Sequence, residues 1–460
     1  MNPNSYQPND TICALATPAG LGAIGVIRLS GTHAIAIANQ CFAGKNLTTV
    51  TSHTAHFGRL VQAEEIIDEV LATVFVEPKS YTGENTVEIS CHGSTYIQQR
   101  ILEVLINAGA RLAQPGEFTL RAFLNGKLDL TQAEAVADLI ASNSEMSHKT
   151  AMNQMRGGFS KEIAMLREKL INFASLIELE LDFSEEDVEF ASRPELQTLV
   201  SNLHKMLLQL VETFKMGNAI KNGVPTVIVG KPNAGKSTLL NALIKEDRAI
   251  VSAIAGTTRD TIEESFTLGG IVYRLIDTAG IREHTADLIE SIGIEKTYEK
   301  IKQASIIIYL FDALETDLDS LSKALAEFDN LEATVIPVAN KIDLGKEQDF
   351  KAKFSSLPEL IYLSSKAQSG LNQLYARLQE VVSKDKVSND VIITNLRHYQ
   401  ALSEAAQALE QVLQSMQQNR KTELLAFDIR KAIFHLGEIT GEITNDDLLA
   451  NIFSKFCIGK

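Results

Sequence analysis

The sequence predicts a multidomain protein: an α/β or α+β N-terminal domain, then a helical bundle domain that is interrupted by an inserted α/β P-loop domain. Three observations support this. The chain has 460 residues, enough for about three domains. Residues 217–385 combine strand-like apolar runs with a complete phosphate-binding loop, whereas residues 121–216 and 386–460 show helical periodicity. Strand-like segments dominate residues 1–120.

The N-terminal domain is predicted to be rich in strands. A helix is expected over Tyr96–Ala108, where apolar residues recur on one face. Gly20–Gly25 matches the dinucleotide fingerprint Gly-x-Gly-x-x-Gly, but the alternating run Val26–Ser30 follows it where a pyrophosphate site needs a helix N-terminus. We therefore reject a dinucleotide site there. The expected strands are Thr11–Ala16, Gly25–Ser30, Leu71–Glu77 and Thr86–Ser90.

Helical patterns fill residues 121–216. Thr131–Glu134 and Ser192–Glu195 each have the spacing of a capping box at a helix start. Gly157-Gly158 is expected to break the first long helix, and the acidic run Asp182–Glu189 to be a solvated connector. The second capping box leads into an apolar stripe, made of Leu196, Leu199, Leu203, Met206, Leu210 and Phe214.

Helical patterns resume after residue 385. Helices are expected over Leu396–Ser415 and Glu423–Leu436, and Thr444–Asp447 is expected to cap a final turn. Helices on both sides of the P-loop domain indicate an insertion, with the flanking segments packed as one bundle.

The segment Gly230–Ser237 is a complete phosphate-binding loop. The apolar run Val227–Val229 precedes it and the helical pattern Thr238–Leu243 follows it, which is the context the motif requires. Backbone N–H groups of such a loop surround phosphates, Lys236 reaches the β and γ oxygens, and Ser237 ligates Mg²⁺. The residues expected to contact the nucleotide are Asn233, Ala234, Gly235, Lys236, Ser237 and Thr238.

Three further motifs follow in order, each at the end of a predicted strand, and together they predict guanine-nucleotide binding. Asp277 lies where a carboxylate can hold Mg²⁺ through water, and Gly280 where an amide can touch the γ-phosphate. Asp343 can accept both the N1–H and the exocyclic amine of guanine. Ligands bind at this edge in doubly wound sheets. The motifs are Asp277-Thr278-Ala279-Gly280, Asn340-Lys341-Ile342-Asp343 and Ser364-Ser365-Lys366.

The sequence lacks the residue that commonly orients the attacking water in GTP hydrolysis. Ras-like GTPases commonly place a water-orienting glutamine after the Asp-x-x-Gly motif, and here Ile281 stands in that position. Asn233 and the carbonyls of the small-residue loop can build an oxygen cage for a monovalent cation, with Thr258 as the second hydroxyl ligand of Mg²⁺. Alternatively, Asn233 only stabilises its turn and the loop is an ordinary switch. The loop comprises Ser252, Ala253, Ile254, Ala255, Gly256, Thr257 and Thr258.

Composition and terminal patterns indicate the location of the protein and the contacts it can make. The first residues lack the patterns of signal and transit peptides, and the longest strongly apolar run, Ser305–Phe311, is too short to cross a bilayer, so a cytoplasmic location is expected. The four cysteines are far apart, which indicates neither a disulfide framework nor a zinc site. The net charge of −15 opposes nonspecific attraction to nucleic acid, so contact with an RNA requires a local basic patch or a more basic partner.

Taken together, the chain resembles the MnmE (TrmE) family of tRNA-modification GTPases along essentially its whole length. The Ras-like G domain carries the family's phosphate loop and the run Ala255–Asp260. Matches in the first domain and at the chain end are Thr82-Gly83-Glu84, Pro115–Thr119, Arg121–Leu130, Ile439–Glu442 and Phe456–Lys460.

The resemblance implies a homodimer formed through N-terminal domains that bind a tetrahydrofolate derivative, 5-formyl- or methylene-tetrahydrofolate. It also implies a heterotetramer or larger complex with an FAD-dependent partner of the MnmG (GidA) family. Together the two proteins would add a carboxymethylaminomethyl or similar aminomethyl-type group to C5 of uridine 34, the wobble position, of certain tRNAs. The first domain would end near residue 120 and the G domain would span residues 217–385.

By matching positions, the resemblance implies folate contacts at Arg28, Glu88, Lys127 and Lys460. It also favours the cation cage, because family members hold K⁺ with residues matching Asn233, Ser252, Ile254 and Thr257. This ion would supply the charge that an arginine finger supplies elsewhere.

Three positions stay less determined by the resemblance. Glu290 matches the water-organising glutamate, one residue further from Asp277 than in relatives, and Glu283 is the weaker contender. Cys457 is either a participant in the chemistry or, slightly favoured, a small packed residue, because no base lies beside it in the sequence.

Two other functions fit parts of the sequence. One is a ribosome-assembly GTPase switch of the Era or Der type, which shares the phosphate-loop style but lacks the folate-type first domain and the Cys-Ile-Gly-Lys ending. The other is a folate one-carbon enzyme with a regulatory G domain, which would turn over free folate without tRNA or a flavoprotein.

Overall fold

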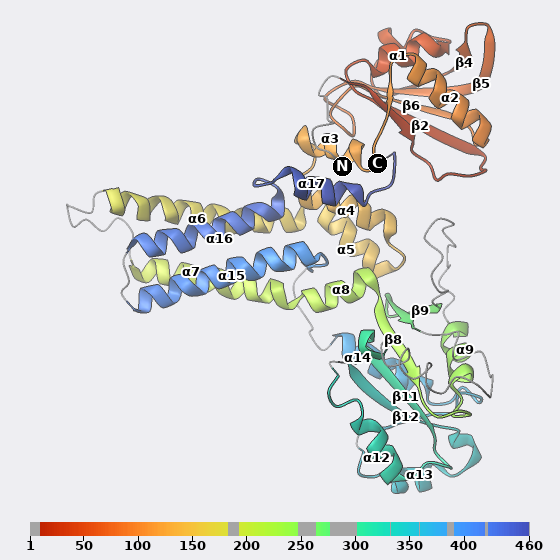
Figure 1. Cartoon of the computed structure of the whole chain (residues 1–460), viewed down its shortest axis with the longest axis vertical. Helices are drawn as coiled ribbons and strands as arrows, with labels where there is room; N and C mark the ends of the chain where they lie inside the picture. The colour runs from red at the N-terminus through yellow and green to blue at the C-terminus, as the bar shows by residue number, and fades with distance from the viewer. Residues whose placement is uncertain are drawn as a thin grey trace. The chain divides into compact units, whose positions relative to one another are not determined.

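The computed structural model describes most of the chain, and its elements are labelled in Figure 1. The described residues are 10–182, 193–246, 264–276, 301–331, 333–357, 359–383, 391–418 and 422–459. They fall into two compact units. The first lies within Met1–Ile140, Met152–Leu203 and Glu404–Lys460, and the second within Ala141–Ala151 and His204–Ser403. The predicted domain limits stay predictions.

Within the described residues of the first unit, seven strands form a mixed sheet in the order β3-β4-β5-β6-β2-β1-β7. All neighbours are antiparallel except β1 and β7. The four strands expected from the sequence are all present, and a strand does follow the rejected dinucleotide fingerprint. The strands are β1 (Ile12–Leu15), β2 (Ile24–Ser30), β3 (Phe42–Ala43), β4 (Thr54–Gln62), β5 (Glu65–Phe75), β6 (Thr86–His92) and β7 (Arg111–Leu112).

Two helices, α1 (Ala34–Cys41) and α2 (Thr95–Asn107), pack on this sheet. Ile37 of α1 and Leu105 of α2 share one core with Leu29, Val74 and Ile89 from the strands. The alternation of apolar and polar residues along β5 and β6 therefore has the cause expected for a sheet with one buried face. A short 3₁₀ helix (Leu47–Thr49) and α3 (Glu117–Leu124) complete this part.

The helical part of the chain begins with α4, and its start differs from the prediction. Asp129, and not Thr131, caps this helix: the Gln132 amide donates to Asp129 Oδ1 at 2.8 Å and the Asp129 amide donates to Gln132 Oε1 at 3.0 Å. The prediction that a capping box at Thr131–Glu134 opens this helix is therefore wrong, and the helix begins two residues earlier. Gly157, with φ of 76°, separates α5 from α6 as predicted. The helices are α4 (Leu130–Ala141), α5 (Glu145–Met155), α6 (Gly158–Asp182), α7 (Arg193–Glu212) and α8 (Phe214–Asn222).

The buried stripe of α7 also differs in part from the prediction. Its buried residues are Leu196, Val200, Leu203, Leu207 and Leu210, which follow the alternating three- and four-residue spacing of a helix face. Of the other residues expected in the stripe, Met206 is 36% exposed, Leu199 is half-buried, and Phe214 lies in α8. The error arises because 206 and 207 are both apolar, and only neighbouring helices decide which is buried.

After the P-loop domain the chain forms α15 (Leu396–Gln417), α16 (Thr422–Thr440) and α17 (Asp446–Ser454). Helices α6 and α16, which lie on opposite sides of that domain in the sequence, pack side by side (Figure 1), as the predicted insertion requires. Asn445 caps α17 by accepting the Leu448 amide at 2.7 Å, so the expected final turn is a nine-residue helix. No helix among the described residues has the length and apolar character needed to span a membrane.

The described residues of the second unit contain a six-stranded sheet in the order β13-β12-β11-β8-β10-β9. The strands are parallel except for β9, which pairs antiparallel with β10. The carboxyl ends of the parallel strands therefore share one edge, where the predicted motifs lie. The strands are β8 (Val224–Val229), β9 (Glu264–Leu268), β10 (Ile271–Leu275), β11 (Ile306–Asp312), β12 (Thr334–Asn340) and β13 (Ile361–Tyr362).

Both faces of this sheet are covered. Ile228 and Ile308 belong to a core with residues of α9 and α14, whereas their neighbours Val227 and Ile307 belong to a second core with residues of α12 and α13. Two-sided burial explains why β8 and β11 are continuous apolar runs. The helices are α9 (Lys236–Glu246), α12 (Leu318–Ala326), α13 (Glu347–Lys353) and α14 (Leu371–Ser383), with a 3₁₀ helix η3 (Ile342–Leu344) between β12 and α13.

Candidate functional site

The phosphate-binding loop connects the end of β8 to the start of α9. Its backbone is left-handed at Asn233, with φ of 63°, and at Gly235, with φ of 102°. Turns that use such residues point successive amide N–H groups into one concavity, which suits an anion. A Cβ on Gly230 would lie 1.9 Å from the Leu310 carbonyl oxygen, so only glycine lets the loop pass β11 this closely.

Lys236 begins α9, and its side chain lies along the loop. Its Nζ donates to the Gly230 carbonyl at 2.8 Å and to the Lys231 carbonyl at 3.1 Å. Burial lowers the pKa of Lys236 from its ordinary value. An ammonium in this position can transfer its hydrogen bonds to β- and γ-phosphate oxygens. Ser237 follows it in the first turn of the helix, where a hydroxyl ligand of Mg²⁺ is required.

One buried side chain joins three of the predicted motifs. Asn340, 2% exposed at the end of β12, donates from Nδ2 to the Ala234 carbonyl at 2.7 Å. Its Oδ1 accepts from the Ser365 amide at 2.9 Å and from the Ser365 hydroxyl at 3.0 Å. The amide group is thus satisfied on both sides, and it fixes the phosphate loop relative to the two loops expected to bind guanine.

Gly235→Ala tests this link. The new Cβ would lie 2.3 Å from Asn340 Nδ2, and alanine is disfavoured at positive φ. We expect GTP affinity to fall at least about tenfold, the equivalent of roughly 1.4 kcal/mol, as measured by fluorescent-nucleotide titration. The control is Gly269→Ala in the β9–β10 turn, where φ is 61° and the new Cβ meets only the flexible end of Gln379. Equal affinities for both variants would contradict the role of Asn340.

An ion pair that was not predicted from the sequence holds the turn after β12. Lys341 is left-handed, with φ of 64°, and its Nζ lies 2.7 Å from Asp312 Oδ2 at the end of β11. Burial alone would raise the pKa of Asp312, but the hydrogen bonds from Lys341 and from the Leu314 amide outweigh burial and lower the pKa. The pair orients the turn that leads to Asp343, whose side chain is exposed in η3 and accessible to a base.

The structure therefore brings together the phosphate loop, Asn340–Asp343 and the Ser364–Lys366 loop at one sheet edge. Ser364 and Ser365 are buried, and Lys366 is exposed. The other predicted nucleotide, cation and catalytic residues lie outside the described residues. These are Ser252–Thr258, Asp277–Gly280, Ile281, Glu283 and Glu290.

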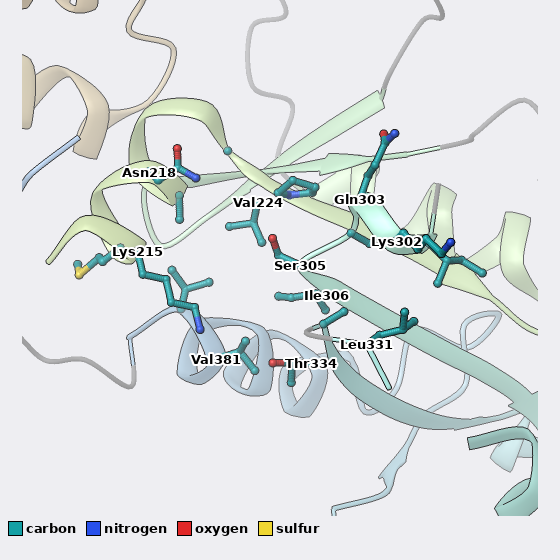
Figure 2. Close-up of a pocket in the computed structure, with 18 of the residues that line it drawn as sticks. Lys215, Asn218, Val224, Lys302, Gln303, Ser305, Ile306, Leu331, Thr334 and Val381 are labelled. Carbon is teal, nitrogen blue, oxygen red and sulfur yellow. The ribbon is translucent and has the colours of Figure 1, made fainter. Parts of the chain in front are cut away.

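A large cavity in the same unit is distinct from the nucleotide site (Figure 2). It has a volume of about 990 Å³ and is lined by residues that include Lys215 of α8, Val224 of β8, Ser305, Thr334 and Val381. Residues 224, 305 and 334 lie at or next to the starts of β8, β11 and β12, so the cavity opens at the opposite edge of the sheet from the phosphate loop.

In the first unit, the predicted folate residues Arg28 and Glu88 face each other across β2 and β6. Arg28 Nε and Nη2 lie 2.9 and 2.7 Å from Glu88 Oε1, so both contacts use the same carboxylate oxygen. The guanidinium also lies over the rings of Tyr81 and Phe118, at 5.3 and 5.7 Å from their centroids. Phe118 is completely buried, so the accessible surface consists of the half-buried charged pair and Tyr81. This combination suits a planar, hydrogen-bonding ligand.

Lys127 takes a different partner: its Nζ donates to the Pro78 carbonyl at 3.0 Å. Its side chain runs past Gly83, in the Thr82-Gly83-Glu84 motif. Lys460 lies outside the described residues, but Gly459 precedes it with its carbonyl oxygen 3.5 Å from Arg28 Nη1. The chain end thus reaches the Arg28–Glu88 pair.

Arg121, for which the sequence predicts no role, is completely buried. Its guanidinium bonds to carboxylates of Asp10, Glu84 and Glu117, at 2.5, 3.2 and 3.1 Å. Glu84 also accepts from the Ser30 hydroxyl at 2.7 Å, next to Arg28 on β2. The motifs around residues 84, 117 and 121 therefore meet in one network that supports the candidate folate site. In the sequence, only the opposite charges of these residues indicated that they could pair.

Cys457 was expected to be packed, and this was wrong: its side chain is exposed. Packing of the tail instead involves Phe453 and Phe456, which share a core with Leu130 and Ala133 of α4. The Gly116 amide donates to the Cys457 carbonyl at 3.4 Å, so the tail also bonds to the loop before α3.

Comparison with known proteins agrees with this architecture. The family model for the MnmE helical domain matches residues 130–457, and that for the N-terminus of the GTP-binding protein TrmE matches residues 11–127. Proteins named tRNA modification GTPase MnmE are similar along nearly their whole length. That of Cytophaga hutchinsonii is 55% identical, covering 98% of each chain; that of Flavobacterium psychrophilum is 52% identical, and that of Bacteroides fragilis 51%, each covering 98% of this chain and 99% of the relative.

Among solved structures, Era in complex with MgGDPNP and a 16S ribosomal RNA fragment matches 40% of this chain and 66% of its own, at 25% identity and a TM-score of 0.26. That score is too low to support a conclusion. The matches to both family models and to full-length relatives, together with the guanine-nucleotide loops joined by Asn340, show that this chain belongs to the MnmE family of tRNA modification GTPases.

Proposed function

We propose that this chain is a K⁺-activated, dimerising GTPase that acts with an FAD-dependent partner of the MnmG type. The pair would add an aminomethyl-type group, such as carboxymethylaminomethyl, to C5 of the wobble uridine of certain tRNAs. A tetrahydrofolate derivative would donate the carbon. One observation carries the proposal: a single chain combines the nucleotide loops joined by Asn340 with the Arg28–Glu88 pair, where the C-terminal tail arrives.

The described part of the nucleotide site fits GTP and its cations. The loop packs so closely against the Leu310 carbonyl and Asn340 that Gly230 and Gly235 leave no room for a Cβ, which fixes the backbone whose amides would bind the phosphates. Mg²⁺ would be held by Ser237 and Thr258, and would neutralise charge on the phosphates. Asn233 is exposed at the loop, and its side-chain oxygen would hold K⁺ together with Ser252, Ile254 and Thr257.

The roles of the remaining residues follow from phosphoryl-transfer chemistry. Lys236 would bind the β- and γ-oxygens, and Glu290 would orient the attacking water in place of the missing glutamine. Asp343 would select guanine, and the loops Asp277–Gly280 and Ser364–Lys366 would complete the site. Asn340 positions the phosphate loop and the Ser364–Lys366 loop, and it does not itself need to touch the nucleotide.

In the first domain the charged pair suits a folate. Both contacts with Arg28 use Glu88 Oε1, so Oε2 can accept an N–H group of a pterin ring, and the half-buried Tyr81 offers a stacking surface. Lys127 and Lys460 would bind the anionic tail of the ligand. Cys457, exposed near this site, stays a candidate for the chemistry.

Reconstitution tests the whole proposal. The purified chain, a flavoprotein of the MnmG type, tRNA, GTP, methylene-tetrahydrofolate and an amine donor, ammonium or glycine, should together yield the modified wobble uridine, detected by mass spectrometry of nucleosides. Omitting the flavoprotein or the folate should abolish the product, and Arg28→Ala should weaken folate binding while leaving the GTPase rate unchanged. GTP hydrolysis without any change in tRNA would favour the alternative of a ribosome-assembly switch of the Era or Der type.

Asp343→Asn tests guanine recognition. Asparagine cannot accept both guanine N–H groups, but it can pair with the additional carbonyl of xanthine. We expect GTP affinity to fall by roughly 10²-fold or more, because the guanine N–H groups lose an acceptor, and affinity for xanthosine triphosphate to rise. Competition binding with both nucleotides measures this, with Asp349→Asn in α13 as the control. Unchanged GTP selectivity in Asp343→Asn would contradict the assignment.

A further inference from the structure

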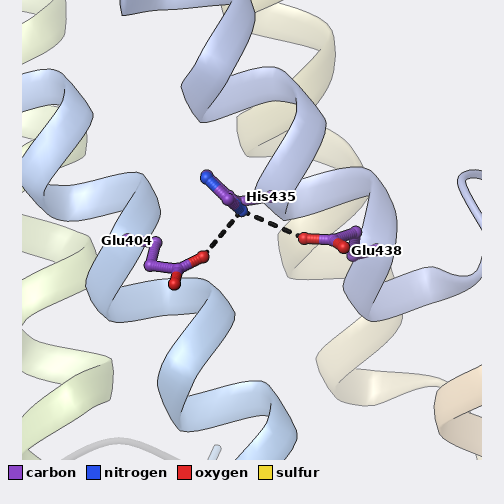
Figure 3. A group of neighbouring side chains, drawn as sticks. All are labelled: Glu404, His435 and Glu438. Atoms are coloured by element: carbon purple, nitrogen blue, oxygen red, sulfur yellow. Dashed lines mark hydrogen bonds and ion pairs between the residues drawn. The ribbon is translucent and has the colours of Figure 1, made fainter. Parts of the chain in front are cut away.

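A histidine and two glutamates that belong to neither candidate site meet between α15 and α16 (Figure 3). Glu404 comes from α15, and His435 and Glu438 come from successive turns of α16. His435 Nδ1 lies 3.0 Å from Glu404 Oε2 and 3.0 Å from Glu438 Oε2. One ligand atom from each of the three residues lies within 4.8 Å of the others. We call these residues the Glu-His-Glu triad.

We propose that the Glu-His-Glu triad binds a divalent first-row transition-metal ion, which would link α15 to α16. Metal–ligand bonds to imidazole nitrogen and carboxylate oxygen are about 2.0–2.2 Å long. Two such ligands lie about 3.0 Å apart at the right angle of an octahedral site and about 3.4 Å apart at a tetrahedral angle. Both separations from His435 Nδ1 are 3.0 Å. An ion can therefore occupy the space between the three groups with small side-chain movements.

The donor set selects the class of metal. Imidazole suits Zn²⁺, Fe²⁺ and Ni²⁺, and carboxylates suit Mn²⁺ and harder ions as well, so one imidazole with two carboxylates favours transition metals over Mg²⁺ or Ca²⁺. Two carboxylates also neutralise a dication, provided that His435 is uncharged with its proton on Nε2. The site would thus differ in kind from the Mg²⁺ and K⁺ sites proposed for GTP hydrolysis.

The Glu-His-Glu triad is partly exposed, so an ion can reach it from the solvent. The His435 side chain is 12% exposed, which restricts its orientation, whereas Glu404 and Glu438 are 56% and 34% exposed. Water can therefore complete the coordination from the open side. Without an ion, the same contacts form when a protonated His435 pairs with two carboxylates, and this second arrangement predicts no metal binding.

Metal titration of the full-length chain distinguishes the two arrangements. The chain is treated with a chelator, and Zn²⁺ binding is measured by competition with a chromophoric chelator at pH 7.5. His435→Gln and Glu404→Gln each remove one ligand at nearly constant size. The control is Glu410→Gln on the same helix, because Glu410 lies outside the triad. GTPase activity, which does not use these residues, shows that each variant is folded.

We expect the wild-type chain and Glu410→Gln to bind one more equivalent of Zn²⁺ than either ligand variant. Loss of a direct ligand should weaken that site by more than the roughly 10- to 100-fold typical of losing an outer-shell partner. Equal Zn²⁺ uptake by the wild type, His435→Gln and Glu404→Gln would overturn the proposal. So would an equal loss of binding in the Glu410→Gln control.

Discussion

Lys236→Ala is expected to lower the rate of GTP hydrolysis by roughly 10²- to 10³-fold or more, the range found when one donor to a developing negative charge is removed. The Nζ of Lys236 lies inside the phosphate loop, within hydrogen-bonding distance of two loop carbonyls. Alanine removes the ammonium group, which is the only part of this side chain that can stabilise the negative charge developing at the β–γ bridging oxygen. Single-turnover hydrolysis at saturating GTP measures the effect.

Lys231→Ala is the matched control, because Lys231 belongs to the same loop, is exposed, and contacts Lys236 only through its backbone carbonyl. Its hydrolysis rate should stay near that of the wild type. If Lys236→Ala and Lys231→Ala hydrolyse GTP equally fast, the loop does not act through Lys236.

Replacing K⁺ by Na⁺ at constant ionic strength is expected to slow hydrolysis at least about tenfold, with little change in nucleotide affinity. The positive charge of an arginine finger is worth about 10³- to 10⁵-fold in other GTPases, and here a caged ion would supply it. Na⁺ is smaller and fits a cage built for K⁺ poorly. Rates under both salts, and the Kd for a non-hydrolysable GTP analogue, provide the measurement.

Asn233→Ala separates a caged ion from a general salt effect. Because Asn233 would be one of the cage ligands, this variant should hydrolyse GTP at the same slow rate in K⁺ and in Na⁺. The control Asn241→Ala in α9 should keep the preference for K⁺. A variant lacking Asn233 that still responds fully to K⁺ would contradict the cage.

The strands and the motif loops could be predicted from sequence because their signals are local. Continuous apolar runs predicted β8, β11 and β12. The motifs Gly230–Ser237, Asn340–Asp343 and Ser364–Lys366, each at a strand end, predicted the phosphate and guanine loops. The start of α4 was predicted less well, since Asp129 and Thr131 are both good N-caps and only the backbone geometry selects Asp129. Met206 and Leu207 posed the same problem within α7.

Contacts between distant segments could not be read from the sequence. Asn340 was predicted to belong to the nucleotide site, but its bonds to Ala234 and Ser365 depend on how β8, β12 and β13 align. Likewise, the direct pairing of Arg28 with Glu88 follows from the register of β2 and β6. Lys341 pairs with Asp312 because parallel strands β11 and β12 end side by side.

Wobble-uridine content in a strain lacking the endogenous MnmE gene most directly tests the claim that hydrolysis at this nucleotide site drives tRNA modification. The strain is complemented with the wild-type chain, Lys236→Ala or Lys231→Ala at equal protein levels, and its tRNA nucleosides are analysed by mass spectrometry. We predict modified wobble uridine with the wild type and Lys231→Ala, and its near-complete loss with Lys236→Ala. Equal modification by Lys236→Ala and the wild type, or no modification by the wild type, would contradict that claim.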